Sequence, residues 1–293
     1  MAIYNLGSIN ADYFYRVPHI VAEGETLSAK SMSSGLGGKG ANQSVAAARA
    51  GAEVFHIGAV GPDGAWAVDR LAEAGVDTTS IRRTETPTAH AIISVADDGE
   101  NAIVIFSGAN MEQTSEALEE AMSTAKPGDL LILQNETSHQ SEAAKIAKDN
   151  GLTVVYSAAP FDVVAVRSIL DHVDVLVMNE VEAQQLIDAT GQALSDLPVS
   201  EVLITLGAQG AEWRNLKTGQ SHKTAAFKVD PVDTTGAGDT FLGYYAAARD
   251  EGKATAEAMT FASAASAIMV TRHGTADVIP TRDEVEQFIA QSQ

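Results

Sequence analysis

The second half of the chain alternates between two kinds of segment. Four short apolar segments rich in branched side chains have the character of buried strands, at residues 129–134, 152–156, 173–178 and 202–206. Segments of helical length lie between them, at residues 138–149 and 180–189. Parallel strands are connected through helices, so this alternation predicts an α/β fold with a doubly wound, mainly parallel sheet and helices on both faces. In such a sheet, ligands bind beyond the carboxyl ends of the strands.

The first half adds strands to this sheet and predicts a second, smaller one. Residues 2–7 and 53–60 have strand character, and a helix is expected at 63–74. His56 lies inside the second strand, where a core histidine is expected. Residues 88–95 and 101–106 flank the turn sequence DDGE, which predicts a β-hairpin. With extended pieces in residues 13–34, this hairpin predicts a small antiparallel sheet outside the main one.

We expect one domain spanning residues 1–293, because no long linker rich in Pro, Gly or Ser divides the chain. The small sheet would be a lid, built from insertions at about residues 11–35 and 84–108. Its exposed edge is suited to pairing two subunits, which predicts a homodimer through the lid.

Charge and composition exclude several classes of partner. The 39 acidic and 19 basic residues give a net charge of -20, which argues against nucleic acid and anionic membranes. Without cysteine, the chain can form neither disulfides nor thiolate metal sites. The N-terminus lacks a cationic start followed by an apolar run, and no stretch approaches a membrane-spanning length. These features predict a cytoplasmic protein.

The helix predicted at residues 237–251 begins with small residues and a carboxylate. Gly236, Ala237 and Gly238 leave backbone N–H groups at its N-terminus with little side-chain cover. Such a terminus binds anions, because the unpaired N–H groups and the helix dipole act together. Asp239 places a base beside any phosphoryl group held there. A tight turn and a helix cap are the alternative roles of these residues.

A second glycine-rich segment, residues 35–43, runs into an Ala-rich helix predicted at residues 44–50. Its glycines allow the backbone to approach a ligand closely. Lys39 and Asn42 are three residues apart and would share one face of a helical turn. The segment is not a Walker A loop, because no Ser or Thr follows Lys39 at the required place. A purely structural turn is the alternative.

Polar residues recur where the predicted strands end. They are Asn10, Asp12, Asn135, Glu136, Asn179, Glu180, Glu182, Thr205 and Gly207. Because the ends of parallel strands share one rim of the sheet, these residues predict a polar ligand site along that rim.

The two glycine-rich segments are similar to the two signature motifs of the ribokinase-like carbohydrate kinases. The motifs are GGKGANQ at residues 37–43 and DTTGAGD at residues 233–239, and the spacing of the polar strand-end residues fits the same family. The resemblance runs from the first strand to the last helix. It implies a doubly wound α/β domain with a β-sheet lid that transfers the γ-phosphoryl group of ATP to a sugar hydroxyl.

The resemblance implies roles for individual residues. Asp239 would take the proton of the attacking hydroxyl, while the N–H groups around Gly236, Ala237 and Gly238 would stabilise the transferred phosphoryl group. The sugar would be bound by Asn10, Asp12, Gly38, Lys39, Asn42, Glu136 and Asp239. On the nucleotide side the implied residues are Asn179, Glu182, Thr205, Gly207, Gly210, Gly238 and Ser263. Glu182 would help to organise Mg²⁺ and its waters.

The resemblance also implies a monovalent cation, K⁺, beside the anion site. The matching positions, mostly through backbone carbonyls, are Asp233, Thr235, Met269, Arg272 and Gly274. Val278 departs from the pattern, because it stands where a serine hydroxyl is expected and has no side-chain oxygen.

D-ribose, phosphorylated at O5 to D-ribose 5-phosphate, is the expected substrate. A kinase for a nucleoside or another sugar is the alternative within the same fold, since Tyr13, Phe14 and Tyr15 could supply an aromatic wall for a nucleobase. A non-catalytic sugar-binding regulator is the alternative from another class. An NAD-dependent oxidoreductase does not fit, because no Gly-x-Gly-x-x-Gly follows the first strand.

Overall fold

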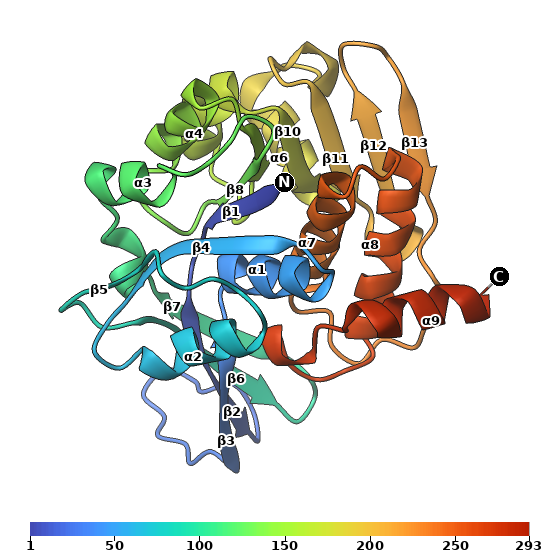
Figure 1. Cartoon of the computed structure of the whole chain (residues 1–293). Helices are drawn as coiled ribbons and strands as arrows, with labels where there is room; N and C mark the ends of the chain where they lie inside the picture. The colour runs from blue at the N-terminus through green and yellow to red at the C-terminus, as the bar shows by residue number, and fades with distance from the viewer. Residues whose placement is uncertain (293) are drawn as a thin grey trace.

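The computed structural model describes residues 1–292 and contains two β-sheets (Figure 1). The larger sheet has the strand order β13-β12-β11-β10-β9-β8-β1-β4-β5. Its strands are β1 (Ala2–Leu6), β4 (Glu53–Val60), β5 (Ile81–Arg83), β8 (Leu130–Gln134), β9 (Thr153–Ser157), β10 (Val175–Asn179), β11 (Glu201–Thr205), β12 (Ala211–Asn215) and β13 (Ser221–Thr224). Neighbouring strands from β11 to β5 run parallel, and β12 and β13 run antiparallel at one edge. The predicted mainly parallel sheet is confirmed.

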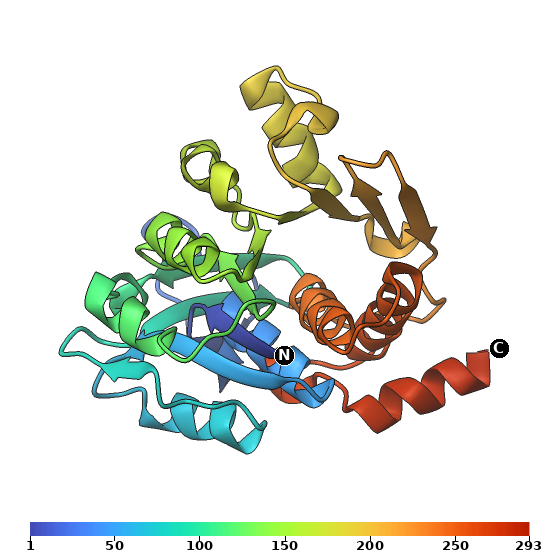
Figure 2. The ribbon, with the colours of Figure 1, turned by 45° about the horizontal axis from the view of Figure 1, so that its top comes forward.

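Helices cover both faces of the larger sheet (Figure 2). One face carries α1 (Lys39–Arg49), α2 (Ala65–Glu73), α7 (Ala237–Asp250) and α8 (Thr255–Met269), with α9 (Arg282–Ser292) packed on α8. The other carries α3 (Ser115–Ala121), α4 (Gln140–Asp149), α5 (Val163–Ile169) and α6 (Glu180–Thr190). Successive strand residues point to opposite faces, so Ile3 enters the first core and Tyr4 the second.

Among residues 1–292, no helix combines the length and the apolar character that crossing a membrane requires.

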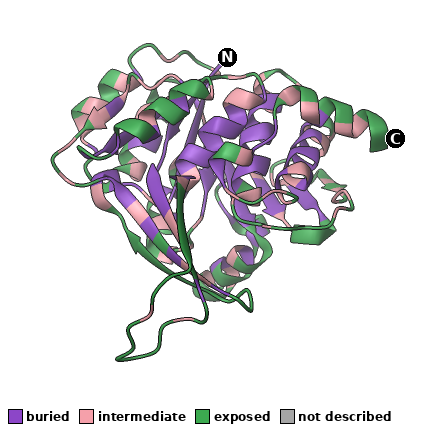
Figure 3. Cartoon of the chain, turned by 90° about the horizontal axis from the view of Figure 1, so that it is seen from below, coloured by how far each residue is buried: buried purple, intermediate pink, exposed green. Residues whose placement is uncertain are grey.

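The smaller sheet projects from the rim of the larger one, and much of its surface is exposed (Figure 3). Its order is β3-β2-β6-β7, with β2 (Asn10–Val17), β3 (Ser31–Gly37), β6 (Ala89–Ala96) and β7 (Asn101–Phe106). The hairpin of β6 and β7 is confirmed. The sheet is not wholly antiparallel as predicted, because β2 and β6 pair in parallel. Both strands leave the larger sheet from the same rim and therefore enter the smaller sheet in the same direction.

Several boundaries differ by one or more residues from the sequence-based expectation, and three of them have a local cause. The helix α1 begins at Lys39 instead of residue 44, because Gly38, with φ 93°, is its N-cap. The helix α2 begins at Ala65 instead of residue 63, because the Asp63 carboxylate accepts hydrogen bonds from the N–H and hydroxyl of Thr88. The sequence of residues 221–229 predicts a short strand, but β13 ends at residue 224. Residues 225–231 leave the sheet edge to cross toward α7 and end in a proline, which cannot donate to a strand ladder.

The helices α1 and α7 approach each other at a distance that only small residues allow. A Cβ atom on Gly243 of α7 would lie 2.5 Å from the Ala46 Cβ and 2.6 Å from the Gln43 carbonyl oxygen of α1. A Cβ atom on Gly40, at the start of α1, would lie 2.2 Å from the Cα of Gly7, which follows β1. The first turn of α1 is therefore held directly against the end of β1.

Candidate active site

The N-terminus of α7 is open in the way its sequence predicts. Gly236 is the N-cap with φ 76°, and a Cβ atom there would lie 2.8 Å from the Met269 Cε. A Cβ atom on Gly238 would meet nothing within 4 Å, so the backbone of this turn faces open space. The N–H of Ala237 already donates to the carbonyl of Thr234, at 3.2 Å. A bound anion would therefore have to compete with the Thr234 carbonyl for the Ala237 N–H.

The carboxylate of Asp239 is buried between α7 and α1, with a side chain on α1 bonded to each of its oxygens. Asn42 donates through Nδ2 to Oδ2 at 3.0 Å, and Gln43 donates through Nε2 to Oδ1 at 2.9 Å. The residue is 9% exposed. Asn42 was a predicted site residue, whereas Gln43 was not. The sequence showed Gln43 only as the last letter of the first motif.

Lys39 is the cation of the site. Its pKa is raised chiefly by the field of Asp239, with further contributions from Glu136 and Glu182, although burial acts in the opposite direction. The ammonium group therefore stays charged at neutral pH and offsets part of the negative charge of the carboxylates around it. These interactions also show that residues predicted on the sugar side and on the nucleotide side lie close to one another.

The predicted sugar-side residues gather where β1 ends and β2 begins. Glu136 accepts hydrogen bonds from the hydroxyl of Ser8 and from the N–H of Lys39, the latter at 3.1 Å. The Asn10 Oδ1 accepts from Asn110 Nδ2 at 2.9 Å. Ser8 and Asn110 were not predicted, although Asn110 follows the second hairpin strand as a polar strand-end residue.

Asp12 stands at this cluster as a buried carboxylate with an altered acidity. Burial, assisted by the negative field of Glu136, raises its pKa to about 7. The carboxylate fits there because the facing strand has a glycine. A Cβ atom on Gly37 would lie 1.9 Å from the Asp12 Oδ2.

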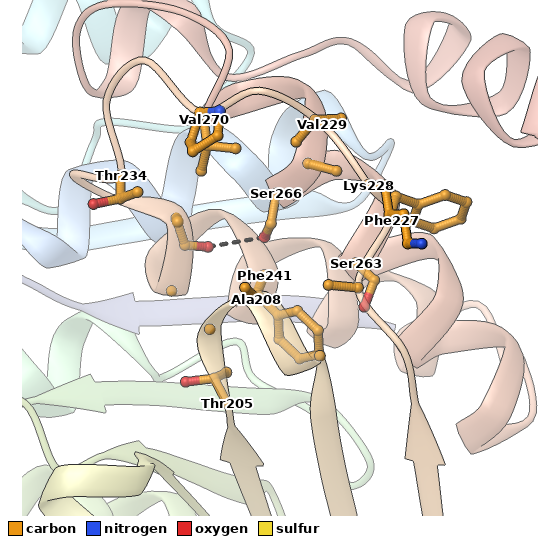
Figure 4. Close-up of a pocket in the computed structure, with 17 residues that line it drawn as sticks. Thr205, Ala208, Phe227, Lys228, Val229, Thr234, Phe241, Ser263, Ser266 and Val270 are labelled. Carbon is orange, nitrogen blue, oxygen red and sulfur yellow. Dashed lines mark hydrogen bonds between the residues drawn. The ribbon is translucent and has the colours of Figure 1, made fainter.

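A pocket of about 430 Å³ opens on the other side of the α7 N-terminus (Figure 4). The predicted residues Thr205, Gly207, Gly210, Gly238 and Ser263 all line it. The wall also includes Ala237, which was predicted at the start of α7, and Ala208, which lies between the predicted Gly207 and Gly210. The lining residues that were not predicted are Ala226, Phe227, Lys228, Val229, Pro231, Thr234, Phe241, Ser266, Ala267 and Val270. Most of these surfaces are apolar, which suits a flat nucleobase. Four of these residues, at 226–229, could not be predicted for the pocket because their sequence has the character of a strand.

Asn179 and Glu182 are not part of the pocket wall; they form the capping box of α6. The Asn179 side chain accepts from the Glu182 N–H, and the Glu182 carboxylate accepts from the Asn179 N–H, each at 2.8 Å. The pKa of Glu182 is raised, chiefly by burial, although the hydrogen bond from the Asn179 N–H and the field of Lys39 act in the opposite direction. Glu182 is thus near Lys39 and Asp239 but already has a structural partner.

The predicted cation residues come together in the loops before α7 and after α8. The Asp233 Oδ1 accepts from the Thr235 N–H at 2.9 Å, and its Oδ2 from the Gly274 N–H at 3.4 Å. The guanidinium of Arg272 is engaged by the Val278 carbonyl and Glu284, so only its backbone carbonyl could face an ion. Backbone oxygens and one carboxylate are hard ligands that fit an alkali cation.

Within residues 1–292, no group of three or more His, Asp or Glu side chains is arranged to hold a metal ion.

We expect the acidity of Asp12 to appear as a pH-dependent stability. The folded protein holds this proton more tightly than the unfolded chain, whose ordinary value is 3.8. Stability contributed by the protonated form is therefore complete below about pH 4 and lost as the pH rises through about 7. The free energy of unfolding of the wild type, measured relative to that of Asp12→Asn, should fall by up to about 4 kcal/mol over that range.

Denaturant unfolding at several pH values measures this difference. Asp98→Asn, in the exposed turn between β6 and β7, is the matched control. The difference in unfolding free energy between wild type and this control should not change with pH. A difference between wild type and Asp12→Asn that stays constant from pH 4 to pH 8 would contradict the assignment.

The chain is similar over its whole length to known proteins. The sequence profile of the pfkB family carbohydrate kinases matches residues 3–282. The ribokinase of Haemophilus influenzae is 38% identical, with 97% of each chain covered. The ribokinase of Bacillus subtilis is 34% identical, covering 97% of this chain and 98% of that one.

Solved structures agree with this relationship. The ribokinase of Thermotoga maritima superimposes with a TM-score of 0.88 at 33% identity, covering 99% of each chain. The Arabidopsis thaliana ribokinase, solved with ribose and ATP, gives a TM-score of 0.87 at 31% identity, again covering 99% of each chain. With the geometry of the site, these matches show that the chain belongs to the pfkB family of carbohydrate kinases and is an ATP-dependent kinase.

Proposed function

We propose that the protein phosphorylates D-ribose at O5, using ATP and producing D-ribose 5-phosphate. One observation carries the proposal: Asp239 and the open backbone at Gly238 stand between a polar cluster and an apolar pocket. The polar cluster suits a sugar, and the pocket suits a nucleobase. The carboxylate between them is where a hydroxyl and a γ-phosphoryl group would meet.

The geometry supports a simple division of labour in catalysis. Asp239 accepts the proton of the attacking hydroxyl, and Lys39 offsets the negative charge that gathers there. The backbone of the α7 N-terminus, with its helix dipole, binds the oxygens of the transferred group. Glu182 would help to hold Mg²⁺ and its waters near the phosphates, and the ion would supply further charge stabilisation when bound. Phosphoryl transfer needs little beyond such positioning and charge compensation.

The choice of ribose rests on the polar cluster and on the relatives. Asn10, Asp12, Lys39, Asn42 and Glu136 provide both donors and acceptors, as a polyhydroxylated ring requires. Ribokinases are similar over nearly the full chain at 33% to 38% identity in several organisms. The deoxyribokinase of Salmonella typhimurium, at 31% identity, keeps deoxyribose as a second candidate.

The orientation of the aromatic side chains on the lid argues against a nucleoside as the substrate. Alternation along β2 places Phe14 on the face that carries Asp12, while Tyr13 and Tyr15 point the opposite way. Tyr13 packs there against His90, with ring centroids 6.2 Å apart. Only one of the three aromatic residues can therefore face a bound substrate. A sugar-binding regulator without catalysis is disfavoured, because such a protein would not need Asp239 at the junction.

We predict that Asp239→Asn binds sugar and ATP with little change but loses on the order of 10² to 10⁴ in kcat, the usual cost of a missing general base. ADP release over a panel of ribose, deoxyribose, other sugars and nucleosides measures both the rate and the substrate. Asp230→Asn, an exposed carboxylate on the preceding segment, is the control. Wild-type turnover by Asp239→Asn would refute its role, and a higher kcat/KM for another panel member would refute ribose.

We also propose that K⁺ binds beside the α7 N-terminus, at Asp233, Thr235, Met269, Arg272 and Gly274. Hydrogen bonds from Thr235 and Gly274 to Asp233 support a loop pre-shaped around this point. The Val278 side chain approaches the same place, since a Cβ atom on Gly274 would lie 3.4 Å from its Cγ1.

Replacing NaCl with KCl at constant ionic strength should raise the turnover rate. Val278→Ser should lower the K⁺ concentration needed for half-activation, because it adds an oxygen ligand near Gly274. Val164→Ser, at an exposed position on α5, controls for the substitution itself. Equal rates in the two salts for both wild type and Val278→Ser would count against the site.

We further propose a single domain whose lid, built from about residues 11–35 and 84–108, pairs two copies of the chain. The edge strand β7 supports this, because it is exposed along its whole length despite an apolar sequence. The exposed large apolar side chains on the strands of the lid are Met32, Ile92, Ile103, Val104, Ile105 and Phe106. Such a patch is unusual on a monomer.

A cytoplasmic location stays a prediction from the sequence.

Light scattering should give the mass of a dimer for the wild type. Val104→Asp combined with Ile105→Asp should give half that mass, because charges at 68% and 62% exposed positions would be buried unpaired in the interface. Val181→Asp, at a 65% exposed position on α6, is the matched control and should remain dimeric. A monomeric wild type at working concentration would exclude the lid interface.

A further inference from the structure

A continuous chain of buried polar side chains leads away from Asp239 beneath α1. Gln134 Nε2 donates to Gln43 Oε1 at 2.7 Å, and Gln43 in turn donates to Asp239. The same Gln134 nitrogen donates to Asn5 Oδ1 at 2.8 Å. The chain continues through Asn5, Ser44 and His56 to the carbonyl of Gly7. Asn5, Gln43, Gln134 and His56 are each 0% exposed, and Ser44 is 1% exposed.

The hydrogen-bond directions in this chain are determined by one group. An ionised Asp239 can only accept, so Gln43 must turn its amide nitrogen toward it and its oxygen toward Gln134. Gln134 must then present its own nitrogen to Gln43, and it donates a second hydrogen to Asn5. The Gln134 Oε1 is left buried without a hydrogen-bond partner among residues 1–292. The ionised state of the carboxylate therefore dictates the orientation of two amides beyond it.

The far end of the chain obeys the same directions. Asn5 Nδ2 donates to the Ser44 hydroxyl at 2.8 Å, which leaves the hydroxyl hydrogen for His56 Nδ1, also at 2.8 Å. His56 then donates through Nε2 to the Gly7 carbonyl at 3.1 Å. This requires a neutral imidazole, and burial lowers the pKa of His56 to about 4. The histidine is a fixed end point for the chain, as well as the core residue that was predicted.

Packing alone does not explain these polar residues. Asn5, His56 and Gln134 continue strand rows whose preceding members, Ile3, Val54 and Ile132, are apolar core residues. Further apolar side chains would satisfy the same rows without the cost of burying amides and an imidazole. A buried polar network is rigid when nearly all its members are paired, and this one ends on the carboxylate proposed as the base.

We propose that Gln43 and Gln134 are positioning residues for Asp239. They set the rotation of its carboxylate and keep it ready to accept the proton of the sugar hydroxyl, while Asn42 holds the other oxygen. The inference rests on the proposed role of Asp239 as the base. The charged groups that act on this carboxylate are Lys39 on α1 and Glu182 on α6, and Glu136 acts on Lys39 in turn. Gln43 and Gln134 add an uncharged, directional contribution that these ions cannot supply.

Replacing Gln43 tests the direct contact. Gln43→Met keeps the volume but removes the donor, and should lower kcat by about ten- to a hundred-fold, the range for a lost hydrogen bond to a charged group. The KM values for sugar and ATP should change by less than about two-fold, since ground-state binding is untouched. Gln43→Glu keeps the shape and places a second carboxylate beside Asp239. The two should share a proton, so the acid limb of the kcat profile should move to higher pH.

Replacing Gln134 tests whether this residue influences Asp239 through its hydrogen bond to Gln43. Glu at position 134 can only accept, so Gln134→Glu should draw the Gln43 nitrogen away from Asp239 and lower kcat without contacting the carboxylate. In a Gln43→Met background the same change should have no further effect on kcat, which a double-mutant cycle measures. Gln113→Glu is the matched control: Gln113 is 3% exposed, and its amide has no hydrogen-bond partner among residues 1–292.

The outcomes separate the two proposals. Full turnover by Asp239→Asn would overturn the proposed base and this inference with it. A slow Asp239→Asn beside Gln43→Met and Gln43→Glu variants with wild-type kcat and pH profile would overturn the positioning chain alone. Additive effects of Gln43→Met and Gln134→Glu would also overturn it. Thermal unfolding of each variant identifies changes that act only through stability, and an unfolded Gln43→Met leaves the decision to the isosteric Gln43→Glu and Gln134→Glu.

Discussion

The site depends on the close contact of α1 with its two neighbours, α7 and the end of β1. Gly243 lets α7 approach the backbone of α1, and Gly40 lets α1 approach Gly7 to within a distance that excludes any Cβ atom. Because both contacts are made by backbone atoms and the Cβ of an alanine, which cannot move out of the way, the two helices have little freedom to shift. Asn42 and Gln43 can therefore reach Asp239 from a fixed direction. A looser packing of larger side chains would separate the proposed base from its supports.

Charge presents a second constraint, since a chain with a net charge of -20 must bind a nucleotide. The structure meets it locally, with Lys39 among Asp239, Glu136 and Glu182, and with an open helix N-terminus at Gly238. These features act over short distances, where the overall negative field is outweighed. The pocket beyond them is mostly apolar, so a nucleobase bound there would not need a cation.

Sequence reasoning succeeded where a residue's chemistry depends on its own neighbours in the chain. The alternation of strands and helices, the β6–β7 hairpin and the glycine-rich start of α7 are all local patterns, and the structure contains each of them. It failed where a segment's environment overrides its local preference. Residues 225–229 have strand character but leave the sheet to line the pocket. Asn179 and Glu182 lie at a strand end as expected, and the structure adds that they form the capping box of α6.

The fold class and the two glycine-rich motifs could be predicted from the residue pattern alone, because periodicity and backbone freedom are properties of consecutive residues. Which polar side chains meet depends instead on how the helices and strands pack. Gln43 is separated from Gln134 by 91 residues and from Asp239 by 196, and nothing in the local pattern of any of them indicates a partner so distant. The same holds for Asp12, whose altered acidity arises from burial beside Gly37 and Glu136. Burial and hydrogen-bond pairing are set by packing between elements, which a linear pattern does not specify.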